Sequence, residues 1–302
     1  MNERINNFRK AILFAGDGLA ELYPLTQVVP KALLPVYDKP LVYYPLSVIM
    51  LAGIKHVALV TRPHDRHAFE RLLGDGTQFG IAIEYLAQAE PGPARSLVTA
   101  REFIAGDAVA LVEGDALVCG EGLQRVLSEA THDEIGATLL AHPVGDARRH
   151  TVVEADDDGR ARSIEIRPEE PRSQLAVMGI SFFAADVVEM AEALTATQPS
   201  GFSTSDLHRR YLAEGRLRVR TFGRGFAWLD TSTPAALLAA TNFIETIENA
   251  HGLKIGCLEE IAYERGWITR DALRRAAIAL PNTYGRYLQR VAEDRFVGQA
   301  RA

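Results

Sequence analysis

The sequence predicts an α/β fold: a Rossmann-like, mostly parallel central sheet with helices on both faces, a mixed β insert and C-terminal helices. Three observations carry this prediction. Short, fully apolar runs alternate with amphipathic stretches up to about residue 112, which is typical of strands buried on both faces. Runs with alternating polarity follow after about residue 135 and indicate mixed or antiparallel strands. Helical periodicity then fills the chain from Pro234 onward.

The first part of the chain reads as strands and helices in alternation. Pro40 suits the first turn of a helix over the following apolar stretch, and Gly53 suits its C-terminal cap. The predicted strands cover 11–15, 57–61, 81–85 and 108–112, and two further helices cover 66–73 and 94–104.

The second part adds mixed strands and then helices. Strands are predicted over 136–141, 151–155, 161–166, 176–183, 217–222 and 226–229, and helices over 204–213, 234–250, 257–265, 269–278 and 283–293. No internal repeat or clear linker interrupts the chain. We therefore expect an α/β domain over residues 1–250 and a helical appendage over residues 251–302 that packs on it.

Composition excludes several classes of function. The net charge of -6 and the pI of about 5.8 argue against a nucleic-acid-binding protein. Cys119 and Cys257 lie far apart without a CxxC partner, which favours a reducing, cytoplasmic setting without a zinc site. No signal peptide and no apolar run of membrane-spanning length is expected.

Candidate ligand residues follow the predicted strands, where open parallel sheets bind ligands. Gly16 begins a glycine-bearing loop that suits a phosphate, and Lys31 lies on a proline-rich loop. Asp115 and Asp230 follow two strands and could share one Mg²⁺. Each residue has a simpler reading as a turn glycine, a solvated lysine or a turn-capping aspartate.

Four longer segments make a family resemblance specific: PKALLPVYDKPLVYYPLSVIMLAGI (30–54), RLLGDGTQFGI (71–81), AWLDTSTPAALLAATNFIETIE (227–248) and GLKIGCLEEIAYERGWI (252–268). From about residue 10 to residue 290 the chain resembles bacterial glucose-1-phosphate thymidylyltransferases. The resemblance implies the nucleotide-diphospho-sugar transferase fold and a homo-oligomer built as a dimer of dimers. It also implies in-line attack of a sugar 1-phosphate on the α-phosphorus of dTTP, with release of pyrophosphate.

Part of the family's site is kept. By resemblance, Lys31 contacts phosphate, and Asp115 and Asp230 hold Mg²⁺. Gln88 falls on the residue that reads the thymine base. Gly16 and Gly92 fall on the nucleotide side. The positions of the sugar pocket are Thr151, Glu165, Arg167 and Trp228, of which Trp228 keeps its place beside Asp230.

Other positions depart from the family's pattern. In the first loop, Asp17 and Leu19 replace glycines, and Glu21 replaces the catalytic arginine. On the sugar side, alanine replaces asparagine at Ala116, and Ile166 replaces a glutamate that accepts hydrogen bonds from sugar hydroxyls. Further replacements are Thr151 for a glycine, Arg167 for a lysine, and residues 201–206 for an acidic segment.

These departures predict that the family reaction is lost or strongly altered while nucleotide binding persists. Three hypotheses stay open. The first is a transferase with another substrate, in which Arg95 or Arg167 supplies the missing charge. The second is a non-catalytic homologue that binds a nucleotide or nucleotide sugar, or regulates an active paralogue. The third is new acid–base chemistry by His150, Asp17, Glu21 and Asp115.

Overall fold

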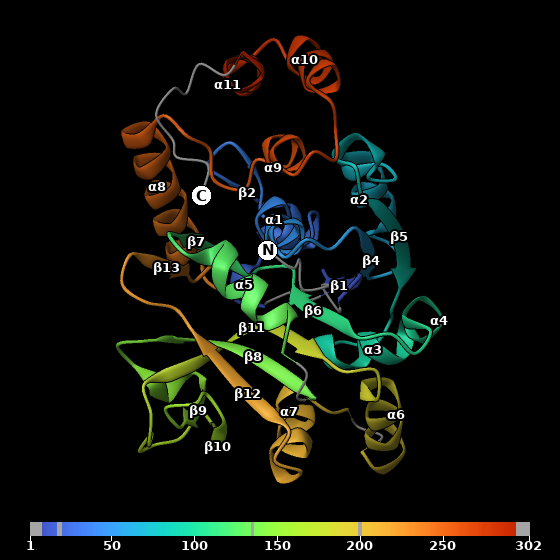
Figure 1. Cartoon of the computed structure of the whole chain (residues 1–302), viewed down its shortest axis with the longest axis vertical. Coiled ribbons are helices and arrows are strands. Elements are labelled where there is room, and N and C mark those ends of the chain that lie inside the picture. Colours follow the sequence, from blue (N-terminus) through green and yellow to red (C-terminus); the bar gives the residue numbers. More distant parts are fainter. Residues whose placement is uncertain (1–7, 17–19, 134–135, 199–200, 294–302) are drawn as a thin grey trace, which may run out of the picture.

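The central sheet of the computed structural model is shown in Figure 1; the structure describes residues 8–16, 20–133, 136–198 and 201–293. Within these residues nine strands form one sheet in the order β10-β9-β11-β6-β1-β4-β5, and β8 pairs with β11 and β12. The strands are β1 (Lys10–Phe14), β4 (His56–Thr61), β5 (Ala82–Ala87), β6 (Val109–Glu113), β8 (Ala137–Pro143), β9 (Thr151–Ala155), β10 (Ala161–Ile166), β11 (Leu175–Phe183) and β12 (Leu217–Thr221).

The strand directions confirm the predicted fold class. β1 runs parallel to β4 and β6, β4 is parallel to β5, and β12 is parallel to β8. Within this sheet, the antiparallel strand pairs are those of β11 with its neighbours and the β9–β10 hairpin. The chain runs outward from β1 through β4 to β5 and returns to β6 on the other side of β1. Ligands of open α/β sheets bind at such a reversal of strand order.

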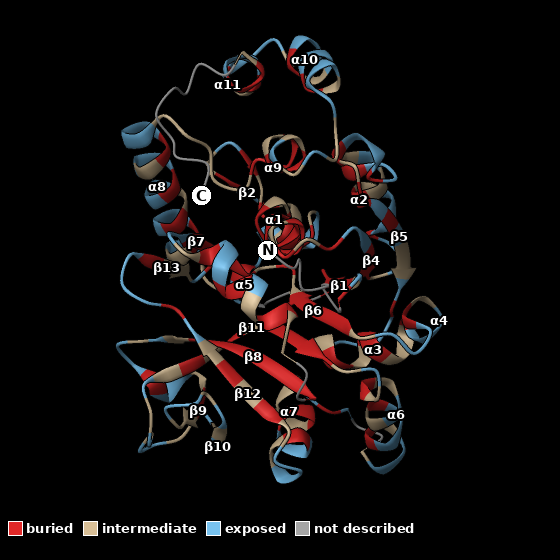
Figure 2. Cartoon of the chain, viewed as in Figure 1, coloured by how far each residue is buried: buried red, intermediate tan, exposed pale blue. Residues whose placement is uncertain are grey.

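Helices cover both faces because neighbouring residues of a strand point to opposite sides. In β1, Ala11 and Leu13 pack into one core cluster, and Ile12 and Phe14 pack into another. Figure 2 shows buried central strands and helices whose outer faces are exposed. The first cluster includes residues of α1 (Tyr43–Leu51), α2 (Arg66–Leu73), α5 (Leu123–Thr131) and α9 (Leu258–Glu264), and the second includes residues of α3 (Ser96–Thr99), α4 (Arg101–Ile104), α6 (Val187–Thr197) and α7 (Thr204–Ala213).

Most predicted elements are confirmed, several with the bounds that the sequence predicts, but three points need correction. Pro40 does not open a helix: it lies in β3 (Lys39–Pro40), which pairs with β2 (Pro35–Val36). The next two backbone N–H groups bond to carbonyls at the hairpin, so α1 begins only at Tyr43. The helix over 94–104 breaks at Ala100 between α3 and α4. The helices α5 and α6 and the strand β7 (Leu117–Gly120) are additional.

Helices α8 (Pro234–His251), α9, α10 (Arg270–Ala279) and α11 (Thr283–Ala292) end the described chain. α9 packs on α1, whereas α10 and α11 share a small core of their own around Leu273, Tyr287 and Leu288. The domain boundary near residue 250 stays a prediction. Among the described residues, no helix is long and apolar enough to cross a membrane.

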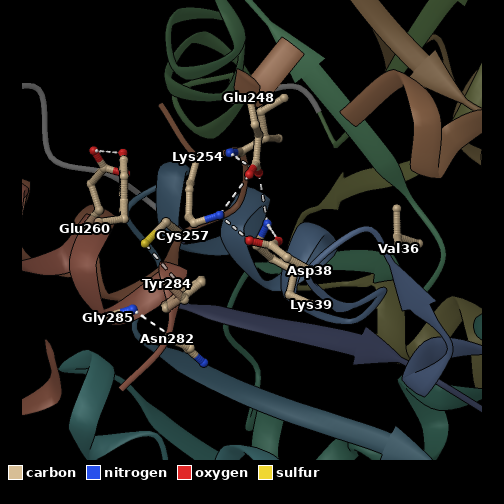
Figure 3. A network of polar contacts seen from close by, with 12 residues as sticks. Val36, Asp38, Lys39, Glu248, Lys254, Cys257, Glu260, Asn282, Tyr284 and Gly285 are labelled. Atoms are coloured by element: carbon tan, nitrogen blue, oxygen red, sulfur yellow. Dashed lines mark hydrogen bonds and ion pairs between the residues drawn. The ribbon is translucent and has the colours of Figure 1, made fainter. Parts of the chain in front are cut away.

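A charge cluster of Asp38, Lys39, Glu248 and Lys254, in which Lys39 and Glu248 are buried, joins the β2–β3 hairpin to α8 and the loop that follows it (Figure 3). Lys39 Nζ lies 2.6 Å from Asp38 Oδ1 and 3.0 Å from Glu248 Oε1. Lys254 Nζ contacts Asp38 and lies 3.0 Å from Glu248 Oε2. Two cations face two anions, so the charges of the cluster are balanced, as buried charges require.

Candidate functional site

Three of the predicted phosphate and metal residues meet at the reversal of strand order. Lys31 begins a 3₁₀ turn, Lys31–Leu33, and its buried ammonium group forms an ion pair with Asp115. β7 pairs antiparallel with β13 (Phe226–Leu229), and Leu117 stands opposite Leu229. Asp115 shortly precedes this pair and Asp230 directly follows it, so both carboxylates lie at the same end of the ribbon.

The environment of Asp230 favours a carboxylate. Burial raises its pKa, but hydrogen bonds from Ser232 and the charges of Lys31 and Arg149 outweigh this effect and hold the pKa below its ordinary value. The described residues contain no cluster of three or more His, Cys, Asp or Glu side chains that could enclose a metal. Two carboxylates beside a phosphate site nevertheless fit Mg²⁺, which takes its remaining ligands from water and substrate phosphates.

A small cavity of about 20 Å³ lies against this group, with Lys31, Glu113, Gly114 and Asp115 in its wall. The cavity is narrow because Lys31 reaches across to Asp115. Gly16 is buried nearby, and a Cβ atom there would lie 2.9 Å from the ring of Phe14, so only glycine fits without a shift.

The departures in the first loop are only partly visible. Asp17 and Leu19 lie outside the described residues. Glu21 lies in a short 3₁₀ turn, Ala20–Leu22, with an exposed side chain. The structure shows no ion pair or hydrogen bond of Glu21 with another described residue, and Glu21 lines neither this cavity nor the one next to it.

The side chain of Gln88, the predicted base reader, is turned into the protein. Its Nε2 donates to the carbonyl oxygens of Glu90 (2.8 Å) and Gly92 (3.0 Å), and its Oε1 accepts from Thr99 Oγ1 (2.9 Å). These bonds occupy the polar atoms of the amide, so reading a base requires Gln88 to give up part of this arrangement. Gly92 has φ of 105° and open space where a Cβ atom would lie.

A larger space has a volume of about 240 Å³ and is lined by three of the four predicted sugar residues, after which we call it the sugar cavity. Trp228 packs near His150, with ring centroids 5.4 Å apart. Thr151 Oγ1 lies 3.4 Å from Ser205 Oγ. The lining residues are Leu111, Glu113, Arg149, His150, Thr151, Arg167, Val177, Met178, Gly179, Ser181, Thr204, Ser205, His208 and Trp228.

The structure places the fourth predicted sugar residue, Glu165, away from the sugar cavity. Its Oε2 accepts a hydrogen bond of 3.1 Å from the backbone N–H of Arg172, and its Oε1 lies 3.4 Å from Arg172 Nε. Ile166 is 43% exposed and does not line the cavity either. Neither position therefore provides a glutamate side chain to the cavity.

Sequence reasoning missed several cavity residues. Arg149 and Glu113 stand directly beside predicted site residues or strand ends, a signal that could have found them. Ser181 and His208 carried no such signal because they lie within a strand and a helix. His208 Nε2 lies 3.0 Å from Ser181 Oγ, and complete burial lowers the pKa of His208 to about 4. His208 is therefore neutral at pH 7.

Comparison with known proteins agrees with this geometry. Residues 10–247 match the family model described as nucleotidyl transferase. The chain is 45% identical to a glucose-1-phosphate thymidylyltransferase of Neisseria meningitidis, over 93% of this chain and 99% of the relative. It is 44% identical to that of Xanthomonas campestris, over 94% and 97%.

Solved structures support the same conclusion. A Bacillus anthracis structure described as a glucose-1-phosphate thymidylyltransferase in complex with a sucrose superposes with a TM-score of 0.71 at 27% identity, over 78% of this chain and 94% of that one. A UDP-glucose pyrophosphorylase shares the fold, with a TM-score of 0.70 at 19% identity, over 80% and 99%. The chain therefore belongs to the nucleotidyl transferase family and is similar along nearly its whole length to glucose-1-phosphate thymidylyltransferases.

Proposed function

We propose that the chain binds a nucleoside triphosphate or nucleotide sugar of the thymidine type, and that transfer of its nucleotidyl group to glucose 1-phosphate is lost or strongly slowed. One observation carries the proposal. Lys31, Asp115 and Asp230 converge at the reversal of strand order, while position 21 carries a glutamate in place of the family's arginine.

Each kept residue has a role in nucleotide binding. Asp115 and Asp230 would hold Mg²⁺, which neutralises charge on the phosphates when bound. Lys31 would exchange its ion pair with Asp115 for a phosphate oxygen, since a buried ammonium group needs an anionic partner. Phosphate binding would therefore replace the ion pair between Lys31 and Asp115.

The expected loss of rate follows from charge. Phosphoryl-type transfer relies mainly on positioning and on cations that neutralise developing negative charge. Loss of one catalytic arginine costs on the order of 10³-fold or more in comparable reactions. A glutamate at that position adds repulsion. By resemblance we also propose a homo-oligomeric assembly and a cytoplasmic location.

The test combines binding and turnover. Titration calorimetry should detect dTTP only when Mg²⁺ is present, and Lys31→Met should weaken this binding. Pyrophosphate release from dTTP and glucose 1-phosphate should be at or near background for the wild type. Glu21→Arg should raise the release at least about tenfold, and more than the neutral control Glu21→Gln does, because only the arginine restores a cation.

The outcomes separate the open hypotheses. Wild-type turnover of about 1 s⁻¹ or faster, as typical enzymes show, would contradict the proposed loss. Absence of nucleotide binding would overturn the proposal altogether. Nucleotide binding without rescue by Glu21→Arg would favour the non-catalytic homologue, and the loss would then also involve the sugar side.

A further inference from the structure

Two arginines of the sugar cavity form no ion pair with a described residue. Arg149 and Arg167 both line the cavity, and in the described part of the chain neither side chain forms an ion pair or a hydrogen bond. The adjacent Arg148 is different: its Nε lies 2.8 Å from Asp146 Oδ1, outside the cavity. The arginine next to the cavity is thus paired with a carboxylate, whereas the two that line the cavity form no ion pair.

The remaining charges of the cavity do not balance these two guanidinium groups. Glu113 is the one acidic side chain among the described residues that line it, and its carbon atoms pack against Gly179. Glu165, at the end of β10, is held outside by Arg172. Among the described residues that line the cavity, the two arginines therefore outnumber the single carboxylate.

The backbone keeps the two arginines together. Arg167 directly follows β10 and adopts φ of 45°, a left-handed conformation that residues other than glycine rarely take. Its N–H donates to the carbonyl oxygen of His150 at 3.0 Å. Arg149 directly precedes His150, so both guanidinium groups start from the same end of the β9–β10 hairpin. Such a rare conformation at a cavity-lining residue is typical of a functional position.

Arg149 also lies near the predicted metal residues, because the ring of the next residue, His150, packs 5.4 Å from that of Trp228, two residues before Asp230. Burial lowers the pKa of His150, Arg149 and Arg167 act in the same direction, and Asp230 and Asp146 act against them. The arginines therefore extend from the metal carboxylates into the sugar cavity. A ligand that spans this distance meets positive charge at more than one point.

We propose that the sugar cavity takes a sugar 1-phosphate whose sugar carries a carboxylate, that is, a hexuronic acid 1-phosphate. The inference rests on the proposed function, because it assigns the sugar ligand of the same site. One guanidinium group binds the phosphate and the other binds the carboxylate, both of which match the planar arginine fork. Thr151 and Ser205 line the same cavity, and their hydroxyl groups would face the ring of the proposed ligand. A neutral hexose 1-phosphate leaves one guanidinium group unpaired.

The experiment compares glucose 1-phosphate with glucuronic acid 1-phosphate by titration calorimetry on the full chain, with and without dTTP and Mg²⁺. We expect glucuronic acid 1-phosphate to bind at least about tenfold more tightly, as expected for an added charge-assisted contact. Of the variants Arg149→Met and Arg167→Met, the one that loses the carboxylate contact should bring the ratio of the two affinities close to one. Arg148→Met is the matched control and should change neither affinity.

The other outcomes overturn the inference. Equal binding of the two sugars, or no binding of either, contradicts it. If each methionine variant weakens the binding of both sugar phosphates equally, both arginines bind the phosphate group and no carboxylate site exists. Thermal unfolding of each variant verifies folding. Nucleotide binding is measured separately, so its failure counts against the proposed function, whereas a preserved sugar preference would still support this inference.

Discussion

The charge cluster and the sugar cavity handle charge in opposite ways. In the charge cluster, Lys39 and Glu248 are almost fully buried, and cations and anions compensate one another. In the sugar cavity, Arg149 and Arg167 line solvent-accessible space and form no ion pair with a described residue. We infer two uses of charged residues from this difference. The compensated cluster stabilises the fold, and the arginines of the sugar cavity are available to bind an anionic ligand.

The largest expected effect lies in the charge cluster. Glu248→Gln removes one anion and leaves Lys39 and Lys254 buried around Asp38 alone. Breaking a buried pair in this way costs about 3–5 kcal/mol. Unfolding in urea should therefore show a large drop in stability.

The exposed Glu245 on the same helix provides the control. Glu245→Gln should change the free energy of unfolding by no more than about 0.5 kcal/mol, as is usual for a surface position. If both variants were equally stable, the charge cluster would not hold the β2–β3 hairpin to α8 as inferred.

His208, one of the two histidines that line the sugar cavity, extends the comparison to pH. The pKa of His208 is about 4 in the folded chain and 6.5 ordinarily, so the folded state binds this proton less readily than the unfolded state does. Its contribution to stability is present above pH 6.5 and is lost as the pH falls toward 4. Between pH 7 and pH 5 the loss should be about 2 kcal/mol.

His208→Gln removes this contribution, so its unfolding free energy should fall less steeply over the same pH range than that of the wild type. Equal slopes would show that His208 is protonated in the folded chain. In that case the histidine, and not only the arginines, would supply positive charge to the sugar cavity.

Sequence reasoning located the predicted phosphate and metal residues more fully than those predicted for the base and the sugar, for a physical reason. Lys31, Asp115 and Asp230 lie on loops at strand ends, where a parallel sheet collects ligand residues whatever the details of packing. The place of Glu165 depends on which arginine binds it, and that of Gln88 on the carbonyl groups around it.

The same distinction applies to the fold. Strands such as β9 and helices such as α7 follow from periodicity alone, and their predicted bounds are confirmed. Pro40 could not be placed from its own preference, because it pairs with Pro35 in the β2–β3 hairpin and the two residues after it donate their backbone N–H groups to Leu34 and Ala32. Hairpin pairing of this kind outweighs the local signal of a proline.

The smallest effect on stability concerns Arg167, and here stability and binding should change in opposite directions. Its φ of 45° is one that glycine adopts without steric cost. Arg167→Gly should therefore raise the free energy of unfolding by up to about 1 kcal/mol, while Arg167→Met, which keeps the strain, should leave it nearly unchanged. Both variants remove the guanidinium group and should weaken binding of the acidic sugar phosphate alike. A glycine variant that is no more stable than the methionine variant would show that the conformation is not strained. The left-handed backbone would then no longer support a functional role for this position, and the assignment of Arg167 would depend on its place in the cavity and its lack of an acidic partner.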